Sequence, residues 1–209
     1  SKAKSITHAL VGLLAGDGKL DIAAPADVPE WRAPGGFFYY SSGTTNIVAR
    51  CAARALDAYG PDFEAFMRQR LFAPLGMASP VPKFDLAGTF IGSSFCFATA
   101  RDFARFGLLY LRDGIWDGRR LLPEGWVDYA RTPTWQQPGA ESDGRYGAHW
   151  WLDIAGPGSF SANGYDGQYT VVVPDLDLVL VRHGATPLDR KDALKDWVAE
   201  VVDCFRAAS

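Results

Sequence analysis

A nearly all-apolar stretch close to the start of the chain constrains the fold more than any other feature. Its apolar residues are Ile6, Ala9, Leu10, Leu13 and Leu14. Their spacing predicts a helix over residues 1–15. A helix that is apolar on most of its surface belongs inside a core rather than on a surface. The fold must therefore be built around this helix.

Two polar residues stand at the beginning of the same helix, Ser1 and Lys4. Residues three apart share one face of a helix. Burial would lower the pKa of the lysine and let it act as a base toward the serine hydroxyl. This is the arrangement of a Ser-Lys acyl-transfer nucleophile. A capping serine followed by a surface lysine fits the same four residues.

A second polar and aromatic cluster occupies residues 38–46, with the sequence FYYSSGTTN. It follows a Pro-Gly turn signal and opens a predicted helix over residues 43–58. A tyrosine at such a loop-to-helix junction, close to a Ser-Lys pair, can carry protons to and from the reacting groups. Aromatic packing at the start of a helix would explain the same residues.

A third cluster covers residues 161–169, with the sequence SANGYDGQY, and leads into a predicted strand over residues 168–174. Glycines flank Tyr165 at positions 164 and 167. They fit either a close approach of the backbone to a ligand or a kink in a hairpin.

The remaining periodicity predicts helices first and strands late, which indicates an α+β fold. Further helices are expected over residues 61–72, 100–112, 123–130 and 190–206, and strands over 146–153, 159–165 and 177–183. Thr99 and Asp102 resemble a capping box. The segment from Ile115 to Leu121 is typical of a hairpin with an Asp-Gly turn.

Composition excludes several function classes. The net charge of −3 gives no electrostatic case for nucleic acid or an anionic membrane. Neither a signal peptide nor a membrane span is visible. The three cysteines lack metal-ligand spacing, and Cys51 and Cys204 are predicted core thiols. Their odd number favours a reducing, cytoplasmic compartment, while a periplasmic or secreted location fits if a signal peptide has been removed.

Other catalytic motifs are missing from the sequence. It has no G-x-S-x-G elbow, H-E-x-x-H, P-loop or G-x-G-x-x-G. Among the histidines, His8 is predicted to pack in the core and His183 to be solvated at the end of a strand. His149 is expected in a strand, where it could face a cleft.

Taken in this order, the three clusters resemble the serine β-lactamase and penicillin-binding-protein superfamily. The class C-like branch, which includes esterases and 6-aminohexanoate-dimer hydrolases, is the most similar. Residues 70–77, 98–107 and 146–151 also resemble sequences of this superfamily. The resemblance implies an antiparallel sheet flanked by helices, with a helical subdomain. It also implies one domain over residues 1–209, mainly helical over 1–80 and of mixed helix and sheet over 81–209.

The resemblance assigns roles by position. Ser1 matches the nucleophile, Lys4 the lysine of the first motif and Tyr40 the tyrosine of the second. Ser42 stands where many relatives have asparagine and is expected to contact substrate. The backbone N–H groups of Ser1 and Gln168 would form the oxyanion hole. The resemblance thus implies hydrolysis of small esters or linear amides through an acyl-enzyme, and it implies no metal or organic cofactor.

The third motif departs from the family pattern. Tyr165-Asp166-Gly167 stands where Lys-Thr-Gly is usual, and these residues are expected to bind substrate. Tyrosine offers a neutral hydrogen bond where lysine offers a charge-assisted one. We therefore expect esters or linear amides to be preferred over β-lactams unless another cation enters the site. His149 and Arg145 are the candidates, and His149 is also assigned to substrate binding.

Alternative functions stay open at this point. They are a β-lactamase or D-Ala-D-Ala peptidase, a non-catalytic β-lactamase-like binding domain, and a hydrolase that uses the α-amine of Ser1 as its base. The spacing between Ser1 and Tyr40 is shorter than in the family. This short spacing predicts a break in the chain between Trp31 and Phe37. Because Ser1 itself matches the nucleophile, the resemblance also implies that an N-terminal part before Ser1 is missing.

Overall fold

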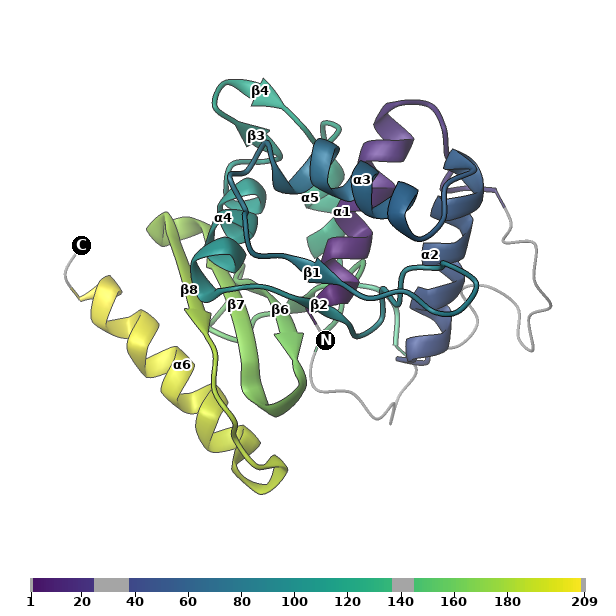
Figure 1. Cartoon of the computed structure of the whole chain (residues 1–209). Helices are drawn as coiled ribbons and strands as arrows, with labels where there is room; N and C mark the ends of the chain where they lie inside the picture. The colour runs from purple at the N-terminus through teal and green to yellow at the C-terminus, as the bar shows by residue number, and fades with distance from the viewer. Residues whose placement is uncertain (1, 25–37, 137–144, 208–209) are drawn as a thin grey trace.

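Three layers of secondary structure make up the molecule (Figure 1). The computed structural model describes residues 2–24, 38–136 and 145–207. A four-stranded antiparallel sheet lies in the middle, with the strand order β5-β6-β7-β8. Helix α6 (Lys191–Arg206) covers one face, and α1 (Ala3–Gly16) and α4 (Ala100–Leu111) lie on the other. The α+β prediction is confirmed.

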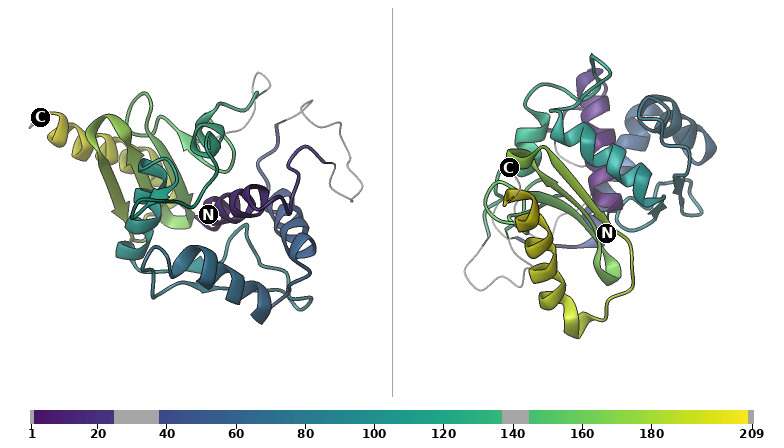
Figure 2. Two further views of the ribbon diagram at one scale, coloured as in Figure 1. Left: turned by 90° about the horizontal axis from the view of Figure 1, so that it is seen from above. Right: turned by 90° about the vertical axis from the view of Figure 1, so that its left-hand side faces the viewer.

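The central sheet consists of β5 (Trp151–Leu152), β6 (Phe160–Gly164), β7 (Gln168–Val173) and β8 (Leu178–Arg182). Alternation along β7 separates two apolar clusters, since successive side chains of a strand point to opposite faces. Tyr169, Val171 and Val173 pack with Leu194 and other residues of α6, whereas Val172 belongs to the larger core on the opposite face. Figure 2 shows α6 lying along the outer face of the sheet.

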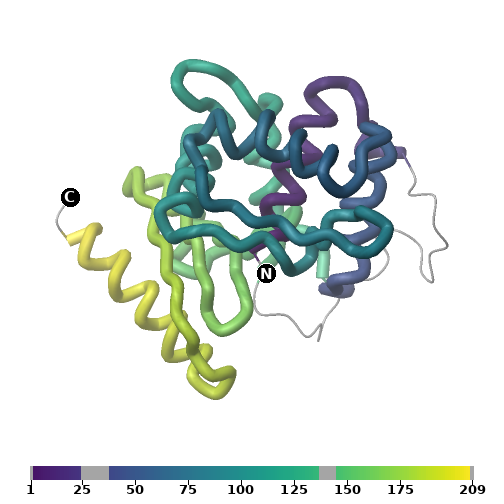
Figure 3. The backbone as a smooth tube through the Cα atoms, in the orientation of Figure 1, coloured from purple at the N-terminus to yellow at the C-terminus, as the bar shows by residue number. Residues whose placement is uncertain are grey.

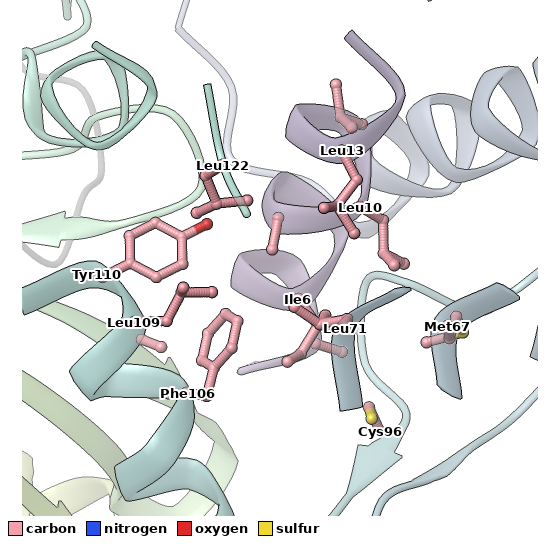
Figure 4. Close-up of a cluster of buried hydrophobic side chains, with 14 of the residues drawn as sticks. Ile6, Leu10, Leu13, Met67, Leu71, Cys96, Phe106, Leu109, Tyr110 and Leu122 are labelled. Carbon is pink, nitrogen blue, oxygen red and sulfur yellow. The ribbon is translucent and has the colours of Figure 1, made fainter. Parts of the chain in front are cut away.

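Helix α1 is the centre of the larger core, as its apolar sequence predicts. Every residue from Ala3 to Leu14 is buried. Figure 4 shows how its apolar side chains meet residues of other elements, among them Leu71, Phe106, Leu109, Tyr110 and Leu122. The first turn of α1 is buried together with the rest of the helix, so close packing restricts the side chains that it carries.

The other elements lie around α1 or beside the helices that pack against it (Figure 1). They are α2 (Ser42–Leu56), α3 (Pro61–Met67) with a π-helical turn (Arg68–Phe72), α5 (Trp126–Arg131), and the strand pairs β1 (Val81–Pro82) with β2 (Cys96–Phe97) and β3 (Ile115–Trp116) with β4 (Arg119–Arg120). The tube in Figure 3 shows the start of α1 beside the β6–β7 hairpin and the β1–β2 segment. Two separate parts of the chain, the β6–β7 hairpin and the β1–β2 segment, therefore lie beside the first turn of α1.

Several local predictions are confirmed and others need correction. The Asp117-Gly118 turn joins β3 to β4 with positive φ at both residues. The strand expected over residues 146–153 is confined to Trp151–Leu152. His149 lies outside it with φ of 62°, because the chain turns back so that Tyr146 pairs with Trp151.

The capping box at α4 is only half formed. The Thr99 side chain accepts from the Asp102 N–H at 3.3 Å. Asp102 does not return the bond, because its carboxylate accepts from Ser79 and Arg105, and the Thr99 N–H donates to Ser79 Oγ instead. The expectation for Cys204 is wrong: α6 is buried on one face only, and this thiol is exposed.

Two sequence-based expectations meet the limits of the described chain. The predicted break between Trp31 and Phe37 falls outside the described residues, as does Ser1. Among the helices that are described, none has the length and hydropathy needed to cross a membrane.

Candidate active site

Lys4 is held in a fixed position at the first turn of α1. Its side chain is 4% exposed, and Nζ donates to the carbonyl oxygen of Ser93 at 2.8 Å. Nζ also lies 4.9 Å from the centroid of the Tyr40 ring. Burial lowers the Lys4 pKa to about 8. A useful fraction of this amine is therefore unprotonated near neutral pH, as a general base requires.

Tyr40, rather than its neighbour Tyr39, faces this lysine. The Tyr40 ring packs against Tyr146 and Trp151, with centroids 5.4 and 5.1 Å apart. Tyr39 is 65% exposed. Ser41 accepts a hydrogen bond from the Thr44 N–H at 3.1 Å and so caps α2 directly after Tyr40. The cap fixes which of the two tyrosines points inward.

The carbonyl that holds Lys4 belongs to a loop that sequence reasoning did not single out. Ser93 lies 89 residues after Lys4. Its N–H donates to Asn46 Oδ1 at 3.1 Å. Asn46 comes from α2, the helix that Tyr40 precedes, so one helix positions both partners of Lys4. The Y-S-S-G-T-T-N run could have suggested a role for Asn46, but nothing local marks Ser93.

A cavity of about 830 Å³ opens beside these residues. Its lining includes Lys4, Tyr40 and Ser42 on one side and the third cluster, Asn163 to Tyr169, on the other. Such a volume suits a small organic molecule. The cavity joins the three sequence clusters, which lie far apart along the chain.

A tight turn between β6 and β7 presents the third cluster. Asp166 and Gly167 have φ of 55° and 76°. A Cβ at Gly167 would collide with the side chains of Leu194 and Arg182, so glycine is required there. Arg182 Nη1 donates to the Gly167 carbonyl at 2.8 Å, and Nη2 donates to Thr186 Oγ1 at 2.6 Å. The hairpin itself thus accounts for the glycines around Tyr165, which is 74% exposed and lines the cavity.

Comparison with known proteins places this arrangement in a family. A model of the β-lactamase family matches residues 11–202. The chain belongs to the β-lactamase family. A 6-aminohexanoate-dimer hydrolase of Paenarthrobacter ureafaciens is 27% identical over 177 residues, which are 78% of this chain and 44% of that protein. The chain thus spans less than half the length of this curated relative.

Solved structures show the same fold. A Bacillus anthracis protein provisionally named as a 6-aminohexanoate-dimer hydrolase superposes with a TM-score of 0.81 at 20% identity, over 99% of this chain and 71% of the other. A family VIII carboxylesterase gives 0.68 at 12% identity, over 94% and 80%. At these identities the likeness establishes the fold, and this β-lactamase-family chain has helices and an antiparallel sheet in the arrangement of its relatives.

Within this β-lactamase-family chain, the proposed oxyanion donor Gln168 is already engaged. Its backbone N–H donates to the Tyr165 carbonyl, which closes the turn. Its side-chain amide donates to the Gly184 carbonyl and accepts from the Gly184 N–H. The role of the Gln168 N–H in an oxyanion hole stays a prediction, and it requires that N–H to be shared with a ligand. Ser1, the other predicted donor and nucleophile, lies outside the described residues.

The histidines of this β-lactamase-family chain have structural partners. His149 Nε2 lies 3.3 Å from Thr45 Oγ1, and its carbonyl accepts from Ser5 Oγ at 2.7 Å. Burial, together with the charge of Lys4, lowers the His149 pKa to about 4. His149 is not among the residues lining the cavity in the described part of the chain. His8 is a core residue as predicted, since it contacts the Tyr110 hydroxyl at 2.7 Å.

The described ranges contain no group of three or more His, Cys, Asp or Glu side chains placed to hold a metal ion.

Proposed function

We propose that this chain is a serine hydrolase that acts on small esters or linear amides through an acyl-enzyme. One observation carries the proposal: a buried lysine with a pKa of about 8 is fixed between a carbonyl and a tyrosine ring at the edge of a cavity. One N–H of the neutral amine stays with Ser93, and its lone pair is left to accept a proton. Ser1 stands three residues before Lys4 in the sequence.

The proposed reaction has two steps. The Ser1 hydroxyl oxygen attacks the carbonyl carbon of the substrate while Lys4 takes its proton. Tyr40 passes a proton to the departing alcohol or amine, and an ester of Ser1 remains. Lys4 then passes the proton it took from Ser1 to Tyr40. Water attacks the ester, and one of its protons passes through Lys4 and Tyr40 to the Ser1 oxygen, so that the carboxylic acid leaves and Ser1 is restored.

The nature of the relatives supports this reaction class. The curated relative is named as a hydrolase of a linear amide dimer, and one structural neighbour is a carboxylesterase. Tyr165 in place of the usual lysine agrees with a substrate other than a β-lactam. The substrates to compare are therefore 4-nitrophenyl acetate, the linear 6-aminohexanoate dimer and the cephalosporin nitrocefin.

Replacement of Ser1 tests the proposal. Ser1→Ala should abolish labelling by a fluorophosphonate probe and lower turnover of 4-nitrophenyl acetate by roughly 10⁴-fold or more, because the proposed acyl-enzyme forms on Ser1. Ser94→Ala is the matched control, since Ser94 also lines the cavity and should label like the unmodified protein.

Three outcomes would contradict the proposal. Labelling that persists in Ser1→Ala would place the nucleophile elsewhere. Labelling without turnover of any substrate would favour a binding domain. Nitrocefin hydrolysis that exceeds ester and amide hydrolysis would favour a β-lactamase.

A further inference from the structure

A second buried lysine, Lys2, lies at the same cavity without a partner. Its side chain is 5% exposed and lines the cavity. Nζ has no hydrogen-bond acceptor among the described residues, and it lies over the face of the Phe103 ring, 4.2 Å from the centroid. A buried ammonium without an acceptor is costly, because nothing replaces the water it has lost. Burial lowers the Lys2 pKa to about 7.

The surroundings of Lys2 connect it to the third cluster. Phe103 packs edge-on against His183, with ring centroids 5.7 Å apart. His183 follows β8 and precedes Gly184, which is bonded to Gln168. Burial and the charge of Lys2 lower the His183 pKa, so the lysine and the imidazole are electrostatic neighbours. Lys2 thus lies near the end of the cavity formed by the β6–β7 turn.

Arg145 and His149, the two cations suggested by the sequence, do not lie at this end of the cavity. Arg145 Nη1 is paired with Asp153 Oδ2 at 2.6 Å on an exposed surface, and His149 is bonded to Thr45. Neither lines the cavity in the described chain. The charged lining residues are instead three lysines, Lys2, Lys4 and Lys191, against one aspartate, Asp166. The cavity is therefore suited to an anion.

We propose that Lys2 binds a carboxylate of the substrate, and that the substrates of this site are small esters or linear amides that carry a carboxylate. This inference rests on the proposed function. Lys4 already has the Ser93 carbonyl, whereas Lys2 has all of its N–H donors available. A carboxylate would give this ammonium the charge-assisted hydrogen bonds that Tyr165 cannot provide.

Two matched substrate pairs test the inference. The first compares mono(4-nitrophenyl) glutarate with neutral 4-nitrophenyl pentanoate, so that the carboxylate is in the acyl half. The second compares 4-acetoxybenzoate with 4-acetoxybenzamide, so that it is in the leaving half. The readout is the ratio of kcat/KM for the anionic and neutral members, divided by the ratio of their hydroxide-catalysed rates. A general loss of activity cancels in this ratio.

In the unmodified protein the corrected ratio should exceed one for at least one pair. Lys2→Met should lower that ratio by about 10- to 100-fold, the effect of removing a charge-assisted hydrogen bond. Lys19→Met, at an exposed lysine beyond α1 and outside the cavity, should leave the ratio unchanged. Thermal unfolding should show that Lys2→Met is folded, because methionine fills a similar volume without a buried charge.

The inference is overturned if the unmodified protein shows no preference for the anion in either pair. It is also overturned if folded Lys2→Met keeps the preference. Both results are distinguishable from failure of the proposed function, in which no member of either pair would be hydrolysed. Competitive inhibition by glutarate but not by glutaramide gives an independent measure of binding, and equal inhibition by the two would count against the inference.

Discussion

The surroundings of Lys4 and of Lys2 differ in one respect, although both lysines are buried at the start of the same helix. Lys4 is bound to the Ser93 carbonyl and lies over Tyr40, which is itself packed against two aromatic rings. Lys2 Nζ lies over the face of Phe103 and has no hydrogen-bond acceptor among the described residues. Burial lowers the pKa of both. A held amine suits proton transfer at one position, whereas an unpartnered amine suits an incoming anion.

This contrast suggests how one short motif can serve two purposes. In S-K-A-K the lysines are two residues apart, so they cannot share a face of the helix. One amine points toward α2 and the Ser93 loop, and the other toward α4 and the end of β8. Catalysis and substrate selection can then be altered separately.

The largest expected effect comes from removing the held lysine. Lys4→Met should lower kcat/KM for anionic and neutral esters alike by about 10²- to 10⁴-fold, the usual contribution of a general base. The ratio within each substrate pair should stay constant, unlike that of Lys2→Met. Steady-state kinetics with both pairs checks this. A Lys4→Met protein that mainly loses the anionic substrate would reverse the two roles.

An intermediate effect is expected at the tyrosine that faces Lys4. Tyr40→Phe keeps the ring packing against Tyr146 and Trp151 but removes the hydroxyl proton. It should lower kcat/KM for 4-nitrophenyl acetate by about a hundredfold. Combined with Lys4→Met, it should add little, because the two groups act as a unit.

The neighbouring residue provides the matched control for that variant. Tyr39→Phe changes the same atom on an exposed ring and should retain full activity. A larger loss for Tyr39→Phe than for Tyr40→Phe would mean that the tyrosine assignment is off by one residue.

The smallest effect is a pH dependence in the unmodified protein. Lys4 must be unprotonated to act as a base, so kcat/KM for a neutral ester should rise with pH through the Lys4 pKa of about 8. The unprotonated fraction grows from about a tenth at pH 7 to about nine tenths at pH 9, which gives roughly a tenfold increase. A pH–rate profile measures it, and Lys4→Met should lack this rise. A midpoint near the ordinary lysine pKa would show that burial does not lower the pKa of Lys4.

Local patterns in the sequence predicted those parts of the site that depend on neighbouring residues. The apolar spacing of α1 implied a buried Lys4, and the run after Tyr40 implied a helix behind it. The antiparallel strands around residues 160–182 were also predictable, because runs rich in β-branched and aromatic residues are separated by turn residues.

Contacts between distant segments were not predictable. The Ser93 carbonyl reaches Lys4 across 89 residues, and Lys2 meets Phe103 only because α4 packs beside α1. His149 was placed in a strand because its neighbours Trp150 and Trp151 favour one, yet the bend needed to pair Tyr146 with Trp151 overrides that preference.

Helix α6 has a consequence for binding that reaches beyond its place on the sheet. Leu188, just before the helix, and Lys191 and Leu194, in its first turn, line the cavity, while Val198 and Val202 anchor its remainder to β7. One wall of the cavity is therefore the end of a helix that is attached to the sheet by a single apolar face. Molecules in which that end of the helix is detached lack this wall of the cavity. The apparent affinity for a ligand is therefore reduced by the fraction of molecules in the detached state. Substitutions far along α6 thus act on ligand affinity through helix docking alone.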